Sequence, residues 1–283
     1  MKRPRISKRP LPMARQDAVE IEARPPPSNR VVLVTGGCQG LGLEICCQMA
    51  ARRWRVAVAD INRSAGPKVV KKLRETGGDA FFIGVDLGSP QGPEQMVWAT
   101  VRHFGRLDVL VNCAAHAVVE PFLEMTPEGW ERTLNVNVRG VALANAAAGK
   151  QMKRQRSGRI INITSPASRM ALSNYTAYSA SKAAMDSITR AAAVALAEFN
   201  IQVNSVAPGM MDTPMQRKTE EVFAKLERCN DFDAFLARRT ARIPAGRRTN
   251  CTEVSQAVVW LATEAPNYII AERLNISGGL DRD

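Results

Sequence analysis

The sequence contains few of the residues that build metal sites and disulfide frameworks. Among 283 residues it has two histidines and six cysteines, and two of the cysteines, Cys46 and Cys47, are adjacent. The cysteines show no metal-ligand or disulfide-framework spacing. This composition disfavours a metal site and a disulfide-stapled secreted fold, and it favours a reduced, cytoplasmic setting.

The sequence also lacks a long apolar run. No uninterrupted apolar stretch reaches the roughly 18 residues needed to span a bilayer, so we expect no association with a membrane. Lysine and arginine total 39 against 27 acidic residues, a net charge of +12, and residues 1–29 are rich in proline and arginine. We expect those residues to form a disordered, solvated extension. Contact of their basic cluster with nucleic acid is the alternative that we do not favour.

Apolar, strand-like runs alternate with helical stretches through the rest of the chain. The runs are VLVTG, VAVAD, FFIGV, LDVLVNCAA, IINIT and IQVNSVAP. Apolar strands that alternate with helices are typical of a parallel sheet covered on both faces. We therefore predict one α/β domain over residues 30–283, with a doubly wound parallel sheet of about seven strands.

A glycine-rich turn follows the first of these strands. Val31 to Val34 reads as a buried strand, and Gly36, Gly40 and Gly42 fall at its junction with a helix. Glycines at such a junction permit a tight turn and close backbone approach, and the helix N-terminus presents free N–H groups to a pyrophosphate. The turn therefore predicts dinucleotide binding, with a purely structural turn as the alternative.

An acidic residue ends the second predicted strand. Asp60 closes VAVAD, eighteen residues after Gly42. A carboxylate at this place can bind the adenosine ribose hydroxyls and would repel a 2′-phosphate. We therefore predict that the cofactor is NAD, with NADP less favoured. A strand-end turn residue is the alternative for Asp60.

A serine, a tyrosine and a lysine make up the third motif, in INITSPASRMALSNYTAYSASK. Tyr178 and Lys182 are four residues apart, so on a helix they project from one face, and Ser165 precedes them. A phenol has an unperturbed pKa near 10, and a neighbouring ammonium favours its ionised form. We expect Lys182 to lower the pKa of Tyr178 and to make it an acid/base for alcohol–carbonyl chemistry. A solvated helix face would also produce the pair.

Taken in order, these motifs resemble those of the short-chain dehydrogenase/reductase family, from about residue 30 to the C-terminus. Thr35 to Gly42 matches the family's TGxxxGxG, and Asn112-Cys113-Ala114-Ala115 stands where the family usually has NNAG. The further matches are Asp86-Leu87 at the adenine, Asn137 in NVNVRG, Pro208-Gly209 with Thr213, IPAGR from Ile243, and the terminal SGG. The resemblance implies a Rossmann fold and a nicotinamide-dependent oxidoreductase.

The resemblance also implies a role for each matched residue. Tyr178 would exchange the proton of the substrate hydroxyl, and Lys182 would hold the nicotinamide ribose. Ser165 would bind the substrate oxygen, and Asn137 would hold a water that relays protons. The implied cofactor-binding residues are Gly36, Gln39, Gly40, Leu41, Gly42, Asp60, Asp86, Leu87, Asn112, Ala114, Tyr178, Lys182, Pro208, Gly209 and Thr213. No metal ligand is implied.

Some positions depart from the family pattern. Cys113 and Ala115 replace an asparagine and a glycine of NNAG, and we expect local repacking of that wall. Cys38 lies in the glycine turn, where a small packed residue is favoured over a redox-sensing thiol. Gln39 stands where NADP-using relatives often carry an arginine, which again favours NAD.

Residues 213–242 stand at the place of the family's substrate lid and carry many charges. One hypothesis is that an arginine of this segment, with Arg217 and Arg239 as the residues to test, holds an anionic substrate group; exposed helix faces with mixed charge pairs are the favoured alternative. His116, just after the NCAA wall, is a candidate to bond a substrate hydroxyl, with a simple loop histidine as the alternative.

The final segment, EAPNYIIAERLNISGG, resembles that of NAD-dependent polyol dehydrogenases, and the chain also resembles 3-oxoacyl carrier-protein reductases. We predict an NAD-dependent enzyme that interconverts a secondary alcohol, such as a polyol or sugar alcohol, and a ketone. The alternatives are a 3-oxoacyl carrier-protein reductase and a non-catalytic NAD-binding sensor. Relatives are commonly tetramers, and the alanine-rich TRAAAVALAEF suits helix contact, so we expect a homotetramer or homodimer.

Overall fold

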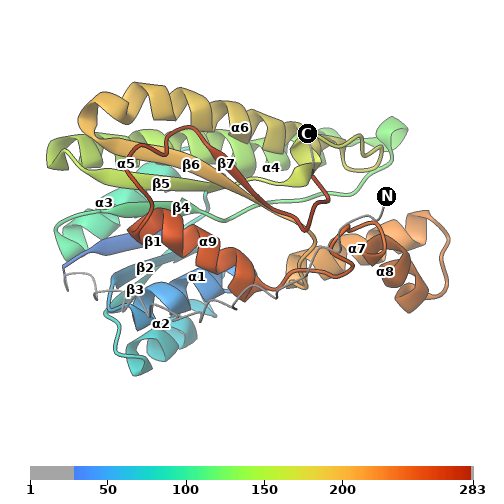
Figure 1. Ribbon diagram of the computed structural model, residues 1–283, viewed down its shortest axis with the longest axis horizontal. Coiled ribbons are helices and arrows are strands. Elements are labelled where there is room, and N and C mark those ends of the chain that lie inside the picture. Colours follow the sequence, from blue (N-terminus) through green and yellow to red (C-terminus); the bar gives the residue numbers. More distant parts are fainter. Residues whose placement is uncertain (1–28, 282–283) are drawn as a thin grey trace, which may run out of the picture.

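The strands form one parallel sheet in the computed structural model, which describes residues 29–281 (Figure 1). The spatial order is β3-β2-β1-β4-β5-β6-β7, and every neighbouring pair is parallel. The predicted α/β fold with a doubly wound sheet of seven strands is confirmed. The strands are β1 (Val31–Thr35), β2 (Arg55–Asp60), β3 (Ala80–Gly84), β4 (Val109–Asn112), β5 (Gly158–Ile163), β6 (Ile201–Pro208) and β7 (Arg273–Ile276).

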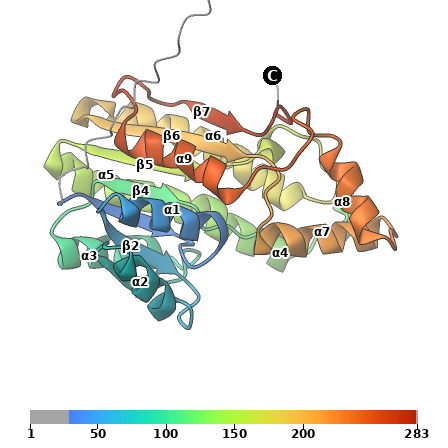
Figure 2. The same cartoon turned by 60° about the horizontal axis from the view of Figure 1, so that its bottom comes forward.

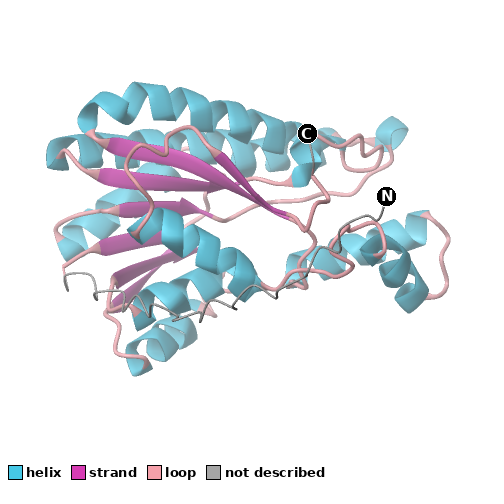
Figure 3. Ribbon diagram, viewed as in Figure 1, coloured by secondary structure: helices cyan, strands magenta, loops and turns pink. Residues whose placement is uncertain are grey.

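Helices cover both faces of the sheet, as Figure 3 shows. Successive strand residues point to opposite faces, so Val32 and Val34 pack into one core while Val31 and Leu33 pack into the other. Both sets are fully buried, which explains the continuous apolar runs of the sequence. The first core lies under α1 (Gly40–Ala51), α2 (Gly66–Glu75) and α9 (Cys251–Thr263), and the second under α3 (Gly92–Phe104), α5 (Val141–Gln155) and α6 (Thr176–Leu196).

The carboxyl ends of the central strands meet where the direction of winding reverses. β1 lies between β2 and β4, and Thr35 at its end is in register with Ala59 and Asn112. In an open α/β sheet, ligands bind at such a switch point, outside the carboxyl ends of the strands. The fold therefore places the glycine turn and Asp60 at a ligand-binding edge.

Two helices of the predicted lid extend beyond this edge, to the right in Figure 2. They are α7 (Pro214–Leu226) and α8 (Phe232–Thr240), and each begins at a side-chain cap, Thr213 and Asp231. Glu220 on α7 is 1% exposed, and both of its oxygens accept hydrogen bonds from Arg248 at 2.9 Å. A buried ion pair thus ties α7 to the segment that precedes α9.

The expected N-terminal extension, residues 1–29, lies almost wholly outside the described residues. Within residues 29–281, no helix is long and apolar enough to cross a membrane.

Candidate functional site

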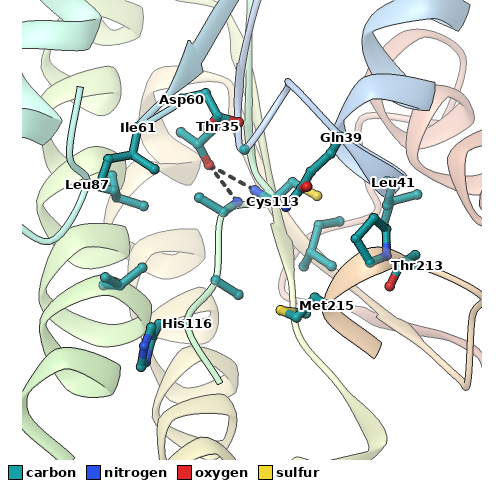
Figure 4. Close-up of a pocket in the computed structure, with 18 of the residues that line it drawn as sticks. Thr35, Gln39, Leu41, Asp60, Ile61, Leu87, Cys113, His116, Thr213 and Met215 are labelled. Carbon is teal, nitrogen blue, oxygen red and sulfur yellow. Dashed lines mark hydrogen bonds between the residues drawn. The ribbon is translucent and has the colours of Figure 1, made fainter. Parts of the chain in front are cut away.

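A cleft of about 320 Å³ opens at the carboxyl edge of the sheet, a size typical of small-ligand pockets (Figure 4). Nearly all of the site residues predicted from the sequence line it; the exceptions are Asn112 and Asn137. The predicted residues in the lining are Gly36, Gln39, Gly40, Leu41, Gly42, Asp60, Asp86, Leu87, Ala114, Ser165, Tyr178, Lys182, Pro208, Gly209 and Thr213.

The glycine turn brings the start of α1 against the end of β1. Gly36 has a φ of +68°, and its N–H donates to the carbonyl of Ala59 at 2.8 Å. A Cβ added to Gly42 would lie 2.2 Å from the carbonyl oxygen of Gly36, so no other residue fits there. Because no side chain caps α1, its first N–H groups remain available at the cleft. The turn therefore forms a backbone cradle that suits an anionic group.

Asp60 is held at the end of β2 by two backbone donors. The N–H of Cys38 donates to Oδ2 at 3.0 Å, and the N–H of Asn62 donates to Oδ1 at 2.9 Å. Burial, helped by the charge of Asp60, raises the pKa of the Cys38 thiol to about 12, so the thiol stays protonated at neutral pH. Asp60 is therefore an oriented acceptor in the cleft, and Cys38 is a packed thiol.

Asp86 is engaged by an arginine that no motif indicated. Nη1 of Arg132, on α4 (Pro127–Leu134), donates to Oδ2 at 2.9 Å, and Nη2 donates to Oδ1 at 3.1 Å. The hydrogen bond from Arg132 holds the pKa of Asp86 below its usual range. Arg132 also lines the cleft, so it belongs to the candidate site. The two residues are 46 positions apart, a separation that no periodicity in the sequence reveals.

The NCAA segment forms a wall that is fixed to β1. The hydroxyl oxygen of Thr35 accepts hydrogen bonds from the N–H groups of Cys113 and Ala114, each at 3.0 Å, as dashed lines show in Figure 4. Burial raises the pKa of the Cys113 thiol to about 12. The cysteine at this departure from the family pattern therefore adds an uncharged surface to the cleft.

Ser165, Tyr178 and Lys182 converge on the cleft from two elements. Ser165 follows β5, and its hydroxyl accepts the N–H of Ala167 at 3.2 Å. Tyr178 and Lys182 lie on α6 and are 8% and 2% exposed. The Lys182 ammonium lies 5.4 Å from the ring centre of Tyr178 and donates to the carbonyl of Ile163 at 2.7 Å. Hydroxyl, phenol and ammonium thus share one buried corner.

Burial dominates the ionisation of this corner. It raises the pKa of Tyr178 to about 12, against a smaller lowering by the hydrogen bond with Ser165. It also lowers the pKa of Lys182 to about 8. The pKa of Tyr178 in the protein alone therefore lies above its ordinary value and not below it, because lost hydration of the phenolate dominates. At neutral pH the phenol is a proton donor.

Asn137 lies behind the cleft in a π-helical turn, residues 135–140, between α4 and α5. Its Nδ2 donates to the carbonyl of His116 at 2.8 Å and to the hydroxyl of Ser181 at 2.9 Å, while Oδ1 accepts the N–H of His116 at 2.8 Å. Such turns are frequent at functional sites. The buried amide fixes the His116 backbone to α6.

Asn112 was predicted to bind the cofactor, and the structure corrects this prediction. Asn112 is 0% exposed and does not line the cleft. Its Nδ2 donates to Oδ1 of Asn145 at 2.7 Å and to Oδ1 of Asn162 at 2.8 Å. The side chain alternation of β4 turns Asn112 into the core, where it joins a buried amide cluster and makes no contact with the cleft.

The remaining lining residues give the cleft a mixed chemistry. His116 faces it, as Figure 4 shows, with Nδ1 3.1 Å from the Thr133 hydroxyl, and burial lowers the pKa of its imidazole. Met211, Met215 and Gln216 also line the cleft. The methionines offer adaptable apolar surface, and neutral histidine and glutamine offer uncharged polar groups.

The two lid arginines named for the anion hypothesis, Arg217 and Arg239, form ion pairs outside the cleft. Arg217 forms an exposed two-bond pair with Asp212 at 2.5 and 2.6 Å. Arg239 lies 3.5 Å from the buried carboxylate of Glu220, with its guanidinium over Phe223. Neither arginine lines the cleft, so the geometry does not support the hypothesis that they hold an anionic substrate.

Within residues 29–281, no cluster of three or more histidine, cysteine or acidic side chains is placed to hold a metal ion. The six cysteines are all free.

Comparisons with known proteins agree with this geometry. A family model described as short chain dehydrogenase matches residues 30–222. The chain is 34% identical over 254 residues to a cyclopentanol dehydrogenase of Comamonas sp., covering 89% of this chain and 97% of that protein.

Two solved structures are also similar to this chain. A variant of actinorhodin polyketide ketoreductase with NADPH is 32% identical, with a TM-score of 0.86 over 90% of this chain and 98% of that one. An NAD⁺-bound xylitol dehydrogenase is 30% identical, with a TM-score of 0.85 over 89% of this chain and 98% of that one.

Proposed function

We propose that this chain, which belongs to the short-chain dehydrogenase family of oxidoreductases, uses NAD to interconvert a secondary alcohol and a ketone. The observation that carries the proposal is a single cleft lined by Ser165, Tyr178 and Lys182 together with Asp60 and the glycine turn. A non-catalytic NAD sensor would have no use for a buried phenol, hydroxyl and ammonium at one corner.

The residues of the cleft fit a nicotinamide dinucleotide. The uncapped start of α1 and the glycine cradle suit its pyrophosphate, and Asp60 suits the hydroxyls of its adenosine ribose. Leu87 and Arg132 supply apolar and planar surface where the adenine is expected. A bound nicotinamide would accept or supply the hydride, and the protein would supply orientation and electrostatics.

Tyr178 and Ser165 control the proton and the charge at the substrate oxygen. In ketone reduction, the protonated phenol of Tyr178 donates to the carbonyl oxygen while the Ser165 hydroxyl stabilises its developing charge. In alcohol oxidation, the phenolate form accepts the same proton. Below a pH of about 8, Lys182 is an ammonium that can donate hydrogen bonds to ribose hydroxyls.

A small hydroxylated substrate, such as a polyol, suits the uncharged polar groups of His116 and Gln216. The similarity to xylitol dehydrogenase supports this class. The methionines at positions 211 and 215 favour an apolar ring or chain instead, and the likeness to a polyketide ketoreductase supports ketoacyl reduction as the second candidate.

A substrate panel run with NAD and with NADP tests the proposal. Polyols, cyclic secondary alcohols and 3-oxoacyl thioesters would be assayed in both directions, with cofactor binding measured separately. We expect turnover of a secondary alcohol with NAD at least about tenfold above NADP, because Asp60 repels a 2′-phosphate. Tight NAD binding without turnover of any panel member would favour the sensor.

The variant Asp60→Ala is the matched test of cofactor choice. Loss of charge-assisted hydrogen bonds, each contributing about 1.5–3 kcal/mol, is expected to raise the KM for NAD about tenfold or more. The ratio of kcat/KM for NAD to that for NADP should fall with it. A wild-type preference for NADP, or an unchanged ratio in the variant, would contradict the proposed role of Asp60.

We also propose that the chain forms a homotetramer or homodimer through α5 and α6. Val194 on α6 is 77% exposed and Leu143 on α5 is 42% exposed, so each of these helices presents an apolar side chain to solvent. Sedimentation is expected to show an oligomer that Val194→Glu weakens. A monomer at micromolar concentration would contradict this.

A further inference from the structure

Arg273 is a buried arginine at the start of β7 whose guanidinium reaches the loop that carries Ser165. Its side chain is 9% exposed. Nη2 donates to the carbonyl oxygen of Ser165 at 3.0 Å and lies 3.4 Å from the hydroxyl of Ser168. The arginine therefore fixes the peptide that follows β5, on which the placement of the Ser165 hydroxyl depends.

The same guanidinium faces a carboxylate on the helix that carries Tyr178 and Lys182. Nε of Arg273 lies 3.5 Å from Oδ1 of Asp186, which is one turn beyond Lys182 on α6. The charge of Asp186 acts directly on Lys182, whose pKa it raises against the lowering by burial. Arg273 thus connects the loop of Ser165 with the helix of the other two reacting groups.

Arg273 also contacts two residues near the end of the described chain, Asn275 and Asp281. Nη2 of Arg273 lies 2.5 Å from Oδ2 of Asp281, and Nη1 donates to Oδ1 of Asn275 at 2.6 Å. The N–H of Asp281 donates in turn to the Ser277 hydroxyl at 3.2 Å. Nη1 and Nη2 therefore donate hydrogen bonds, while Nε, Oδ1 of Asp186 and Oδ2 of Asp281 are paired by charge without a hydrogen bond.

Stability alone does not explain such a cluster. Replacing a buried ion pair with apolar residues of similar volume is often neutral or stabilising, since removing the charges from water costs several kcal/mol for each ion. Here the side chains of one cation and two carboxylates are 4–10% exposed. The cluster joins three segments that are far apart in the sequence, two of which carry the reacting groups. Its contacts point to a role in holding geometry.

We propose that Arg273 is a positioning residue of the active site, holding the Ser165 loop in register with Tyr178 and Lys182 on α6 through its bridge to Asp186. The inference rests on the proposed function, because it assumes that Ser165 and Tyr178 act on the substrate. Arg273 lies outside the lining of the cleft and acts only through these neighbours. Small displacements of reacting groups cost up to about a hundredfold in rate, so its loss should appear in kcat.

The test compares Arg273→Met and Arg273→Lys with a matched arginine elsewhere in the sheet. Arg159 lies at the amino end of β5, at the opposite end of this strand from the cleft. It donates to the carbonyls of Leu261 and Ala265, each at 2.7 Å. Arg159→Met is therefore expected to lower Tm with kcat unchanged. Turnover, the KM for NAD and Tm would be measured for all three variants well below their Tm values.

We expect Arg273→Met to lower kcat about tenfold or more with the KM for NAD within about twofold, because the cofactor cradle is untouched. Arg273→Lys keeps a charge between the two carboxylates and folds, but a single ammonium cannot replace the fork, so kcat should remain reduced. An equal loss of kcat in Arg159→Met, or full kcat in Arg273→Lys, would overturn the proposal. If Tyr178→Phe is inactive while both Arg273 variants keep wild-type kcat, the inference fails and the proposed function stands. Undiminished turnover in Tyr178→Phe defeats the proposed function itself.

Discussion

Replacing Tyr178 with phenylalanine is expected to lower kcat by about a thousandfold, within the range that positioned acid/base groups contribute. The substitution removes one oxygen from a ring that is 8% exposed, so the packing of α6 is kept. The phenol is protonated at neutral pH, with its pKa near 12, and it is the group from which a substrate carbonyl would take its proton. Single-turnover reduction of a ketone, followed by NADH absorbance, measures the loss.

The chain offers two matched controls for this substitution, since it has three tyrosines. Tyr175 stacks on Tyr178 with ring centres 4.4 Å apart, but it does not line the cleft. Tyr268 is 96% exposed. Phenylalanine at either position is expected to leave kcat within about threefold of wild type, because neither hydroxyl faces the substrate. Binding of NAD by all three variants shows that the cofactor site is intact. Comparable losses at Tyr175 and Tyr178 would show that the ring pair, and not the phenol proton, controls turnover.

The fold was predictable because its signals are local. The central strands are buried on both faces, so they appear as short apolar runs, and the glycine turn appears as three glycines within seven residues of Thr35. The Tyr178–Lys182 pair follows from helical spacing alone. These features depend on neighbours in the sequence, which the sequence displays directly.

Other parts of the site depend on contacts between distant segments. Arg132 meets Asp86 across 46 positions, and Arg273 meets Ser165 across 108, and no spacing rule connects them. Asn112 was misplaced for a related reason. At the end of a strand, a polar residue can face the cleft or a buried polar cluster, and the amides of Asn145 and Asn162 decide between these.

Electrostatics of the lid and of the catalytic corner also needed the structure. The charge of Arg217 was visible in the sequence, but its pairing with Asp212 and the burial of Glu220 beside Arg239 were not. The raised pKa of Tyr178 also depends on contacts that the sequence does not display. Sequence spacing supplies the nearby ammonium, but the loss of hydration that raises the pKa comes from every element packed around the phenol.

Replacing Lys182 with methionine is expected to make the stability of the protein, measured relative to wild type, greater at neutral pH than at alkaline pH. Burial lowers the pKa of Lys182 from its ordinary 10.5 to about 8, so below pH 8 the folded protein carries an ammonium that is costly to bury. Between pH 8 and 10.5 the unfolded chain binds more protons than the folded one, so the stability of the wild type rises with pH. The variant has no such rise. Its free energy of unfolding relative to wild type should therefore fall by about 2–3 kcal/mol between pH 7 and pH 10, at about 1.36 kcal/mol per unit of pKa.

The pH dependence, and not the stability at one pH, isolates the ammonium. Methionine leaves the carbonyl of Ile163 without the donor that now lies 2.7 Å away, which costs about 1–3 kcal/mol at every pH and offsets the gain. Lys68 on α2 is exposed, so Lys68→Met should follow the wild-type curve in urea unfolding from pH 7 to 10. A Lys182→Met curve parallel to wild type would show that the ammonium is well solvated in the folded protein. With the expected slope, and with turnover lost in the same variant, the lysine would be a residue that costs stability and is retained because the site needs a cation beside the ribose and the phenol.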